Sequence, residues 1–231
     1  LKYWGYTETY SYSFISKKLI ERVNLKTDTH VKIKNPLTEE TEYMRISLIP
    51  SLLTVVAENQ YISDSLSLFE LSKVYLKEKG TLPKEESMLA IAQHAGFFHL
   101  KGTLSALLAE IGFSNYTFQS KEIPPFFHPK QSLSIFSGNR YVGTFGKIHP
   151  FLTTQFMLKN DLYITELDLA RILPLCNPRK TYTQVSSYVP IKEDFTLIIP
   201  SSVPVGDIMA EVKKVDPYIT AVQFKDRFEK S

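Results

Sequence analysis

The chain has 231 residues, of which 43% are hydrophobic and 22% are charged, a balance typical of a folded globular protein. Its formal net charge of +3 lacks the clear basic excess of most nucleic-acid binders, so any contact with RNA must be local. No apolar run approaches the ~20 residues of a membrane-spanning helix, and a single cysteine, Cys176, excludes an internal disulfide and a multi-cysteine zinc site.

The rest of the composition sets the scale of the fold. The length allows one full domain and a smaller one, and the 15 Phe and 13 Tyr favour a core rich in β-sheet. One free cysteine is typical of a reducing compartment, so we expect a cytoplasmic protein with no membrane partner. The chain begins at Leu1 with neither Met nor a signal peptide, and we interpret it as part of a longer protein.

The first element expected is a strand. Residues 7–14 alternate aromatic and polar side chains, with Tyr10, Tyr12 and Phe14 on one face, which predicts a half-buried strand. A short helix over about 16–23 follows.

Residues 35–56, NPLTEETEYMRISLIPSLLTVV, run from a strand end through an acidic loop into a buried helix. Pro36 ends a short strand over 31–34, because Pro cannot donate to a ladder. Ser47 suits the N-cap of the helix, and Pro50 falls in its first turn, where a missing N–H costs nothing. On residue type alone, Arg45 is interpreted as a surface or supporting arginine. The loop carboxylates, interpreted as solvated, are Glu39, Glu40 and Glu42.

The middle of the chain predicts the body of the fold. Residues 66–76 are interpreted as a central strand buried on both sides, and residues 97–111 as a helix with Gly112 at its C-terminal cap. Gly143 and Gly146 interrupt a hairpin strand, where glycine marks a bulge or a closely approached backbone. The other expected elements are a turn over 80–86, strands over 88–95, 132–136, 141–148 and 161–168, and helices over 151–157 and 169–175.

The tail follows a different pattern. Residues 177–181, NPRKT, are polar and contain Pro, which is typical of a linker. Beyond them the pattern predicts strand, helix and strand over 194–199, 203–215 and 219–228. The helix carries an apolar stripe of Val205, Ile208, Met209, Val212 and Val215.

Residues 35–53 resemble the bacterial phenylalanyl-tRNA synthetase beta chain, whose pattern there is close to N-P-L-x-x-E-x-x-x-M-R-x-S-L-x-P-x-L-L. The matching residues are Asn35, Pro36, Leu37, Glu40, Met44, Arg45, Ser47, Leu48, Pro50, Leu52 and Leu53. A second family pattern is kept by Phe127, His128, Pro129, Ser132, Gly143, Gly146, His149 and Pro150. Three positions depart from the family: Ser72 replaces a Gly, His99 an Asp and Ser105 a Glu. The resemblance assigns Asn35, Pro36, Arg45, Gly143, Gly146 and His149 to structural motifs.

The resemblance implies an α+β fold in two parts. Residues 1–176 would form a class II aminoacyl-tRNA synthetase-like antiparallel sheet with helices, joined by the linker over 177–181 to residues 182–231. The second part would be the first half, βαβ, of a ferredoxin-like anticodon-binding domain. Relatives usually have two basic residues before Asp194, where this chain has Lys192 and Glu193, so local positive charge is halved.

Motifs for chemistry are missing from the sequence. It has no P-loop and no G-x-G-x-x-G. Class II synthetases stabilise the charge that develops in adenylation with two arginines, in an R-x-E/D strand and a G-x-G-x-E-R strand. The resemblance aligns these strands with residues 72–76 and 163–167, and neither contains Arg. His128 and His149, each before a Pro, are interpreted as structural loop histidines rather than zinc ligands, because no third ligand is near in sequence.

The resemblance therefore implies a non-catalytic module of the beta subunit of phenylalanine–tRNA ligase. The module would dock the catalytic alpha subunit in a tetramer of two alpha and two beta chains. ATP and magnesium would serve the parent enzyme, with no catalytic residue, cofactor or metal site in this chain. The tail would contact tRNA(Phe) through Lys192, Lys213 and Lys214. Two alternatives stay open: a stand-alone class II-like paralogue that binds or adenylates a small molecule, and a pure protein-interaction scaffold.

Overall fold

A computed structural model describes residues 1–63, 65–80, 82–177, 179, 182, 184, 187–200 and 202–228. The chain divides into two compact units, Leu1–Thr181 and Tyr182–Ser231. The linker predicted over 177–181 lies mostly outside the described residues.

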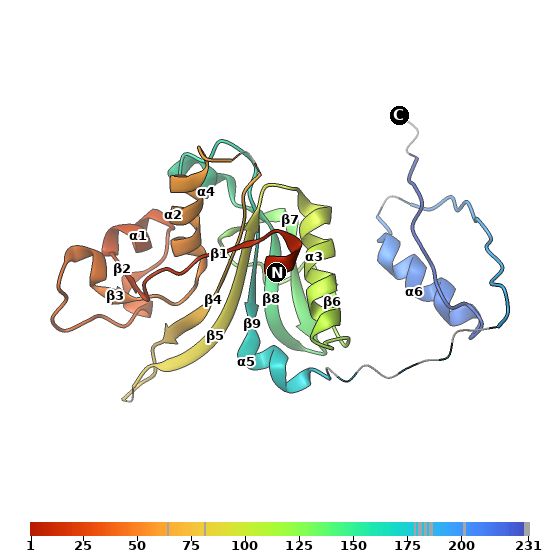
Figure 1. The fold of residues 1–231 in the computed structure, drawn as a ribbon, viewed down its shortest axis with the longest axis horizontal. Coiled ribbons are helices and arrows are strands. Elements are labelled where there is room, and N and C mark those ends of the chain that lie inside the picture. Colours follow the sequence, from red (N-terminus) through yellow and green to blue (C-terminus); the bar gives the residue numbers. More distant parts are fainter. Residues whose placement is uncertain are drawn as a thin grey trace. The chain divides into compact units, whose positions relative to one another are not determined.

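A seven-stranded sheet forms the centre of the first unit (Figure 1). Its order is β1-β4-β5-β9-β8-β7-β6, and every pairing is antiparallel except the parallel pairing of β1 with β4. The predicted mixed fold with a largely antiparallel sheet is thus confirmed. The strands are β1 (Thr7–Glu8), β4 (Ser67–Leu76), β5 (Lys84–Gln93), β6 (Thr117–Gln119), β7 (Phe127–Ser137), β8 (Arg140–Ile148) and β9 (Tyr163–Asp168).

Helices cover both faces of the sheet. On one face, α2 (Ile49–Asn59) packs with α1 (Lys17–Arg22) and α4 (Pro150–Gln155) over an apolar cluster that includes Ala90 and Ile164. On the other, α3 (Phe97–Glu110) packs over a cluster that includes Ile91 and Phe145. Neighbouring strand residues point to opposite faces, so the sheet is the middle layer of three. The remaining short elements are β2 (Phe14–Ile15), β3 (Tyr43–Met44), α5 (Leu169–Ile172), η1 (Lys2–Trp4), η2 (Thr27–Thr29), η3 (Glu39–Thr41) and η4 (Leu173–Leu175).

The long periodic segments match their predictions and the edges of the sheet do not. The helix predicted over 97–111 is confirmed, as is the helix that Pro50 starts. The strand predicted over 7–14 is wrong, because only its ends pair, as β1 and β2, while the residues between them bind side chains of β4. The strand over 66–76 is not buried on both sides: Leu71 is 52% exposed, since β1 covers only the start of β4.

In the described residues of the second unit, the only regular element is α6 (Val205–Val215). The strands predicted over 194–199 and 219–228 do not form ladders there. A ferredoxin-like fold is a split βαβ unit, in which a later strand lies between the first two, so these two segments would not pair with each other. They are joined instead by an ion pair between Lys225 Nζ and Asp194 Oδ2 at 2.5 Å.

None of the helices in the described parts of either unit is both long enough and apolar enough to cross a membrane.

Candidate functional site

Arg45 is fully buried, so of the two alternatives from residue type it is the supporting arginine and not a surface one. Its Nη1 lies 2.8 Å from Glu70 Oε1, and neither side chain has exposed surface. Nε donates to the Lys73 carbonyl oxygen at 3.1 Å, and Nη2 donates to Ser72 Oγ at 2.6 Å. Burying a charge is costly unless it is paired and hydrogen-bonded. Arg45 is therefore a structural residue, fixed by these three partners on β4 and by Ser11.

Arg45 and Ser11 also close the outer edge of β4. Ser11 Oγ donates to the two carboxylate oxygens of Glu70 at 2.9 and 2.7 Å, and accepts from Arg45 Nη1 at 2.8 Å. Further along, the N–H of Tyr75 donates to the Arg45 carbonyl oxygen at 2.9 Å. An open strand edge invites pairing with other chains, and this cover removes much of that edge from contact.

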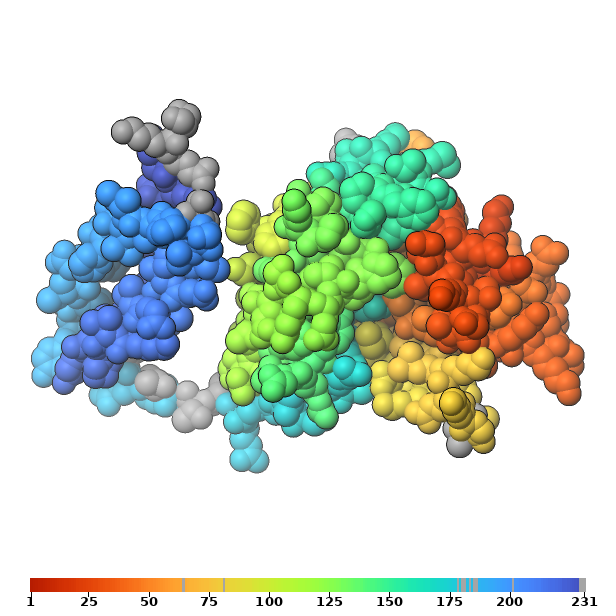
Figure 2. All heavy atoms as spheres, turned by 180° about the vertical axis from the view of Figure 1, so that it is seen from behind, coloured from red at the N-terminus to blue at the C-terminus, as the bar shows by residue number. Residues whose placement is uncertain are grey.

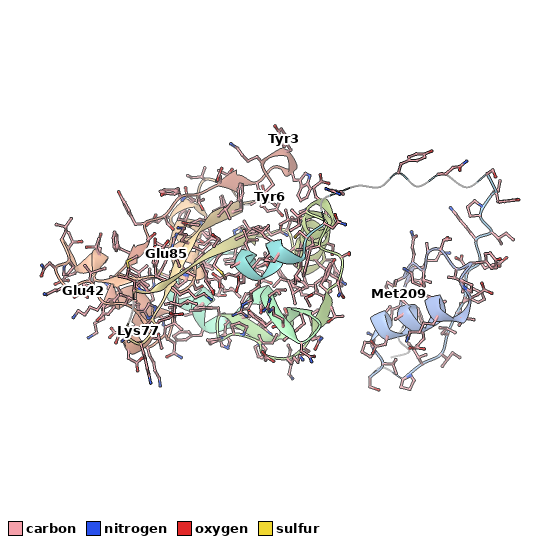
Figure 3. All side chains as sticks on the ribbon, turned by 90° about the horizontal axis from the view of Figure 1, so that it is seen from below. Tyr3, Tyr6, Glu42, Lys77, Glu85 and Met209 are labelled. Carbon is pink, nitrogen blue, oxygen red and sulfur yellow. The ribbon has the colours of Figure 1, made fainter. Side chains whose placement is uncertain are left out.

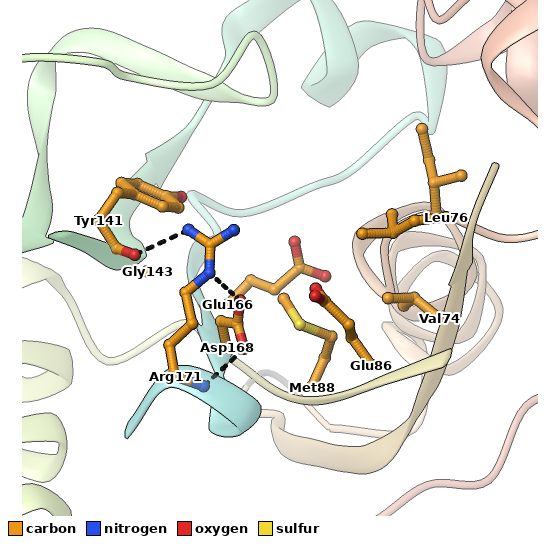
Figure 4. A pocket seen from close by; sticks show the side chains of 10 residues that line it. Val74, Leu76, Glu86, Met88, Tyr141, Gly143, Glu166, Asp168 and Arg171 are labelled. Carbon is orange, nitrogen blue, oxygen red and sulfur yellow. Dashed lines mark hydrogen bonds and ion pairs between the residues drawn. The ribbon is translucent and has the colours of Figure 1, made fainter. Parts of the chain in front are cut away.

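A hollow of about 180 Å³ lies on the α2 face of the sheet, over β4, β5, β9 and β8 (Figure 4). Its walls contain three carboxylates, one guanidinium and one phenol, with an apolar remainder. The lining residues are Ile46, Val74, Leu76, Glu86, Met88, Tyr141, Gly143, Glu166, Asp168 and Arg171. Its position over the central strands and its polar lining make it a candidate binding site.

Glu166 joins β9 to the start of α2. Its Oε1 accepts from the Leu48 N–H at 2.7 Å and from Ser47 Oγ at 2.9 Å. The N-cap of α2 is Leu48, so the prediction of Ser47 as the cap is wrong by one residue. Ser47 Oγ still accepts from the Ile49 N–H at 3.1 Å and donates to Glu166. Burial raises the pKa of Glu166 to about 7, although the helix N–H groups, Ser47 and the nearby Arg45 all act to lower it. A carboxylate here is stabilised by the helix N-terminus, which attracts negative charge.

Asp168 and Arg171 form the second polar contact in the hollow. Arg171 Nε lies 2.7 Å from Asp168 Oδ2, and Arg171 Nη1 donates to the Tyr141 carbonyl oxygen at 3.0 Å. Figure 4 shows this guanidinium turned toward Asp168 and Tyr141. Burial raises the pKa of Asp168, and raises that of Tyr141 to about 12. The second synthetase strand contains no arginine, as the sequence predicts, yet Arg171 reaches the hollow from α5, four residues beyond it.

The side chains around this hollow do not fit a nucleoside triphosphate. Ligand pockets usually measure roughly 300–1,000 Å³, and this one is about 180 Å³. Three carboxylates would repel the phosphates, and the one lining guanidinium is already bound to Asp168. The other nearby guanidinium, that of Arg45, is enclosed by Glu70 and Ser72. Nor do the described residues include a cluster of three or more His, Cys, Asp or Glu arranged to hold a metal ion.

The two glycines of β8 permit close approach to neighbouring strands. A Cβ on Gly143 would lie 2.6 Å from the Glu166 carbonyl oxygen, and one on Gly146 would lie 2.3 Å from Ser132 Oγ. Gly146 also has a φ of +154°. The prediction of a closely approached backbone is confirmed at both positions.

The two histidines before prolines act on local backbone. His149 Nδ1 accepts from the Phe151 N–H at 3.1 Å as the N-cap of α4, and His128 Nδ1 accepts from the Lys130 N–H at 3.1 Å. Each ring thus binds the backbone N–H two residues further along the chain, His149 at the start of α4 and His128 within β7. Asn35 and Pro36 lie exposed in the loop before η3.

The lysines proposed for RNA contact lie in the second unit. Lys213 and Lys214 are exposed in the last turn of α6, where Lys214 Nζ lies 2.6 Å from Glu211 Oε1. Lys192 is exposed in the irregular segment before α6.

Sequence reasoning missed Glu166, Asp168 and Arg171. A signal was present, because two acidic residues two positions apart on a buried strand are unusual. They share one face, and their need for polar partners predicts a structured site.

The fold belongs to a known class of protein. A solved pyrrolysyl-tRNA synthetase of Desulfitobacterium hafniense matches with a TM-score of 0.60 and 16% identity, over 74% of this chain and 63% of that one. The first unit therefore has the fold of a class II tRNA synthetase domain. Within that class, the family described as "Phenylalanyl tRNA synthetase beta chain CLM domain" matches residues 1–169, and the chain belongs to this family.

Curated relatives agree with that assignment. The phenylalanine–tRNA ligase beta subunit of Carboxydothermus hydrogenoformans is 28% identical over 90% of this chain, and that of Fusobacterium nucleatum is 31% identical over 98%. The chain spans 28% of the first relative and 30% of the second. It thus matches less than a third of each.

Proposed function

We propose that this chain is part of the beta subunit of a phenylalanine–tRNA ligase, the ATP- and magnesium-dependent enzyme that attaches phenylalanine to tRNA(Phe). The first unit is a non-catalytic scaffold that docks a catalytic alpha subunit, in a tetramer of two alpha and two beta chains in the cytoplasm. The second unit, the first half of a ferredoxin-like anticodon-binding domain, contributes to tRNA recognition. Membership of the beta-chain family supports this assignment.

One observation supports the proposal that the first unit is non-catalytic. The hollow over the sheet is small and acidic, and its guanidinium is held by Asp168. Transition-state stabilisation needs positive groups already aimed at the place where negative charge develops. Carboxylates from β5 and β9 line the hollow instead. The scaffold therefore has the fold of a synthetase without the positive groups that adenylation needs.

ATP–pyrophosphate exchange tests this role. The purified beta subunit alone is expected to show no exchange, and the assembled enzyme to keep its exchange rate when Arg171 of beta is changed to Met. A matched control is Arg22→Met, which removes a guanidinium that lies outside the hollow, 4.0 Å from the ring centroid of Phe156 and bonded to the Gln155 carbonyl oxygen. Exchange by the beta subunit alone, lost in R171M and kept in R22M, would favour the stand-alone paralogue.

The proposed role of the second unit in tRNA recognition is tested by measuring the affinity for tRNA(Phe). We expect Lys213→Ala with Lys214→Ala to weaken tRNA(Phe) binding by the full tetramer and to lower the salt slope by roughly two, one for each phosphate that is no longer neutralised. The control pair is Lys17→Ala with Lys18→Ala, which are adjacent exposed lysines on α1 with a similar local ion pair to Glu21. Equal affinities in both pairs would favour a pure protein scaffold. Lys192→Ala is expected to weaken tRNA(Phe) binding in the same way and to lower the salt slope by roughly one.

A further inference from the structure

The lining of the hollow on the α2 face is part apolar and part acidic. The apolar residues are Ile46, Val74, Leu76 and Met88. The carboxylates are Glu86 on β5 and Glu166 and Asp168 on β9. Strand pairing gathers them, because Met88 stands opposite Asp168 in the register and alternate residues of a strand share one face. In Figure 4, Val74 and Leu76 lie on one side of these carboxylates and Arg171 on the other.

Glu86 has an incomplete set of partners. Its side chain is 7% exposed, and its Oε1 lies 2.6 Å from Lys84 Nζ. Its Oε2 accepts no hydrogen bond from any of the described residues. The Lys84 side chain is itself 56% exposed, so water screens the pairing. A nearly buried carboxylate oxygen without a donor is costly, and Glu86 can therefore accept from a further donor in the hollow.

Glu166 has neutral donors but no cation partner among the described residues. Its two oxygens accept from Ser47 Oγ at 2.9 and 3.1 Å, and Oε1 also accepts from an N–H that begins α2. Lys84 and Arg171 pair with the other two carboxylates, so the hollow holds one negative charge in excess when Glu166 is ionised. Burial raises the pKa of Glu166 to about 7, and repulsion from Glu166 adds to burial in raising the pKa of Tyr141.

The size of the hollow limits what it can hold. At about 180 Å³ it is below the roughly 300–1,000 Å³ of most ligand pockets, so it suits a group no larger than one side chain. A bare metal ion is not favoured, because the described residues include no cluster of three or more His, Cys, Asp or Glu arranged to hold one. Lysine and arginine side chains place an apolar stem along apolar surface and a charged head in a polar setting, which matches this lining.

We propose that the hollow binds one ammonium or guanidinium group carried on a short apolar stem, with Glu86 and Glu166 as the acceptors and Val74 and Leu76 along the stem. A free alkylamine and a lysine or arginine side chain of another protein share this chemistry. The hollow lies where β4 ends and β5 begins, and Figure 2 shows these strand ends, in yellow, at the surface of the first unit. The inference does not depend on the proposed function, which the exchange assay tests separately.

A methyl signal reports binding at the site itself. The full beta subunit is labelled with ¹³C at its methionine methyl groups, and the signal of Met88, which lines the hollow, is assigned by its loss in Met88→Leu. We expect n-butylammonium chloride to shift this signal in a saturable way. Neither n-butanol, which has the same stem without the charge, nor sodium chloride at the same ionic strength should do so.

Two variants assign the acceptors. Glu166→Gln should weaken butylammonium binding about tenfold or more, because a hydrogen bond to a charged acceptor is lost, and Glu86→Gln should weaken it as well. The matched control is Glu85→Gln, since Glu85 precedes Glu86 on β5, faces away from the hollow and is labelled in Figure 3. The thermal midpoint of each variant shows whether it is folded.

The pH dependence gives a second signature. A bound cation favours the ionised form of Glu166, so affinity should rise with pH through about 7, the pKa of this group without the ligand. In E166Q this rise should disappear. The other ionisable groups around Glu166 are Arg45 before α2, Tyr141 on β8, and Glu86, Asp168 and Arg171.

Each outcome is decisive. A saturable Met88 shift with butylammonium, whose affinity falls in E166Q and not in E85Q, supports the site. An equally strong response to n-butanol, an affinity unchanged in E166Q, saturation by magnesium chloride at lower concentration, or no shift at all overturns it. Nα-acetyl-lysine amide separates the two sources: tighter binding than butylammonium indicates a protein side chain as the natural ligand, and weaker binding indicates a free amine.

Discussion

Two carboxylates on the α2 face of the sheet are satisfied in opposite ways. Glu70 on β4 faces a guanidinium and a hydroxyl in the interior, with no exposed surface. Glu166 on β9, two strands away, has no cation within ion-pair distance among the described residues and faces the hollow. It relies on Ser47 and the N–H groups that begin α2. The first carboxylate is held by an ion pair, whereas burial raises the pKa of the second to about 7.

One short segment serves both carboxylates. Arg45 holds Glu70, and Ser47 with Leu48 holds Glu166, so residues 45–48 tie β4 to β9 across β5. The difference shows that one short segment of this fold can hold two carboxylates in different ways, one by an ion pair and one by the N–H groups at a helix start. The polar side chains that line the hollow bind one another: Arg171 is paired with Asp168, and Ser47 donates to Glu166.

The largest effect should come from breaking the fully buried pair. Arg45→Met leaves Glu70 buried without its cation, and we expect a loss of about 3–5 kcal/mol in the free energy of unfolding. Urea denaturation measures it. Changing Glu70 to Met in the same chain should recover part of the loss, since no unpaired charge remains. The control Lys17→Met breaks an exposed pair with Glu21 and should cost under ~0.5 kcal/mol. A loss below ~1 kcal/mol in R45M would show that the ion pair between Arg45 and Glu70 contributes little to the free energy of unfolding.

The smaller effect at Glu166 depends on pH. Its folded-state pKa is raised to about 7, so the folded chain binds more protons than the unfolded chain between the ordinary pKa of Glu, 4.5, and 7. Stability therefore falls as pH rises through this window, and the loss is complete above it. In Glu166→Gln we expect this slope to disappear, with a gain relative to wild type of about 1–2 kcal/mol at pH 8 compared with pH 5.

Thermal unfolding at a series of pH values checks the prediction at Glu166. Glu85→Gln is a suitable control, because Glu85 is exposed beside Lys73 and faces away from the hollow. A pH slope that persists in E166Q would place the titrating group elsewhere.

Much of the fold could be predicted because its helices are long and periodic. The apolar stripe and Pro50 were enough for α2, and 3-4-3 spacing for α3. The course of residues 9–13 could not be predicted in the same way. Alternation of Tyr and Ser indicates that one face is buried, but which face depends on Glu70 and Arg45, residues that are distant in sequence.

The candidate site was harder to predict for the same reason. Arginine is usually exposed, so residue type alone favours a surface position for Arg45. Its burial follows from a partner 25 residues away. Arg171 was missed because the family's second strand ends at residue 167, whereas the chain turns at Asp168 and carries the arginine back to the hollow on α5. In both cases a side chain with ordinary local context acquires its position from tertiary contacts.

The smallest effect should come from the third carboxylate, that of Asp168. It has a cation partner, as Glu70 does, but it lines the hollow, as Glu166 does. Asp168 is nearly buried, but the Arg171 side chain is 43% exposed, so water screens their pairing. Arg171→Met should cost about 0.5–1 kcal/mol, far less than R45M, because the Asp168 carboxylate keeps the N–H that begins α5 as a donor. Urea denaturation in low and high salt separates the charge contribution from that of packing, since only the former is screened. Asp168→Asn is the matched partner variant, and similar small losses in both fit a screened pair. A loss in R171M that approaches that of R45M would mean that the hollow is as tightly bound together as the edge of β4, and the contrast between the two regions would not hold.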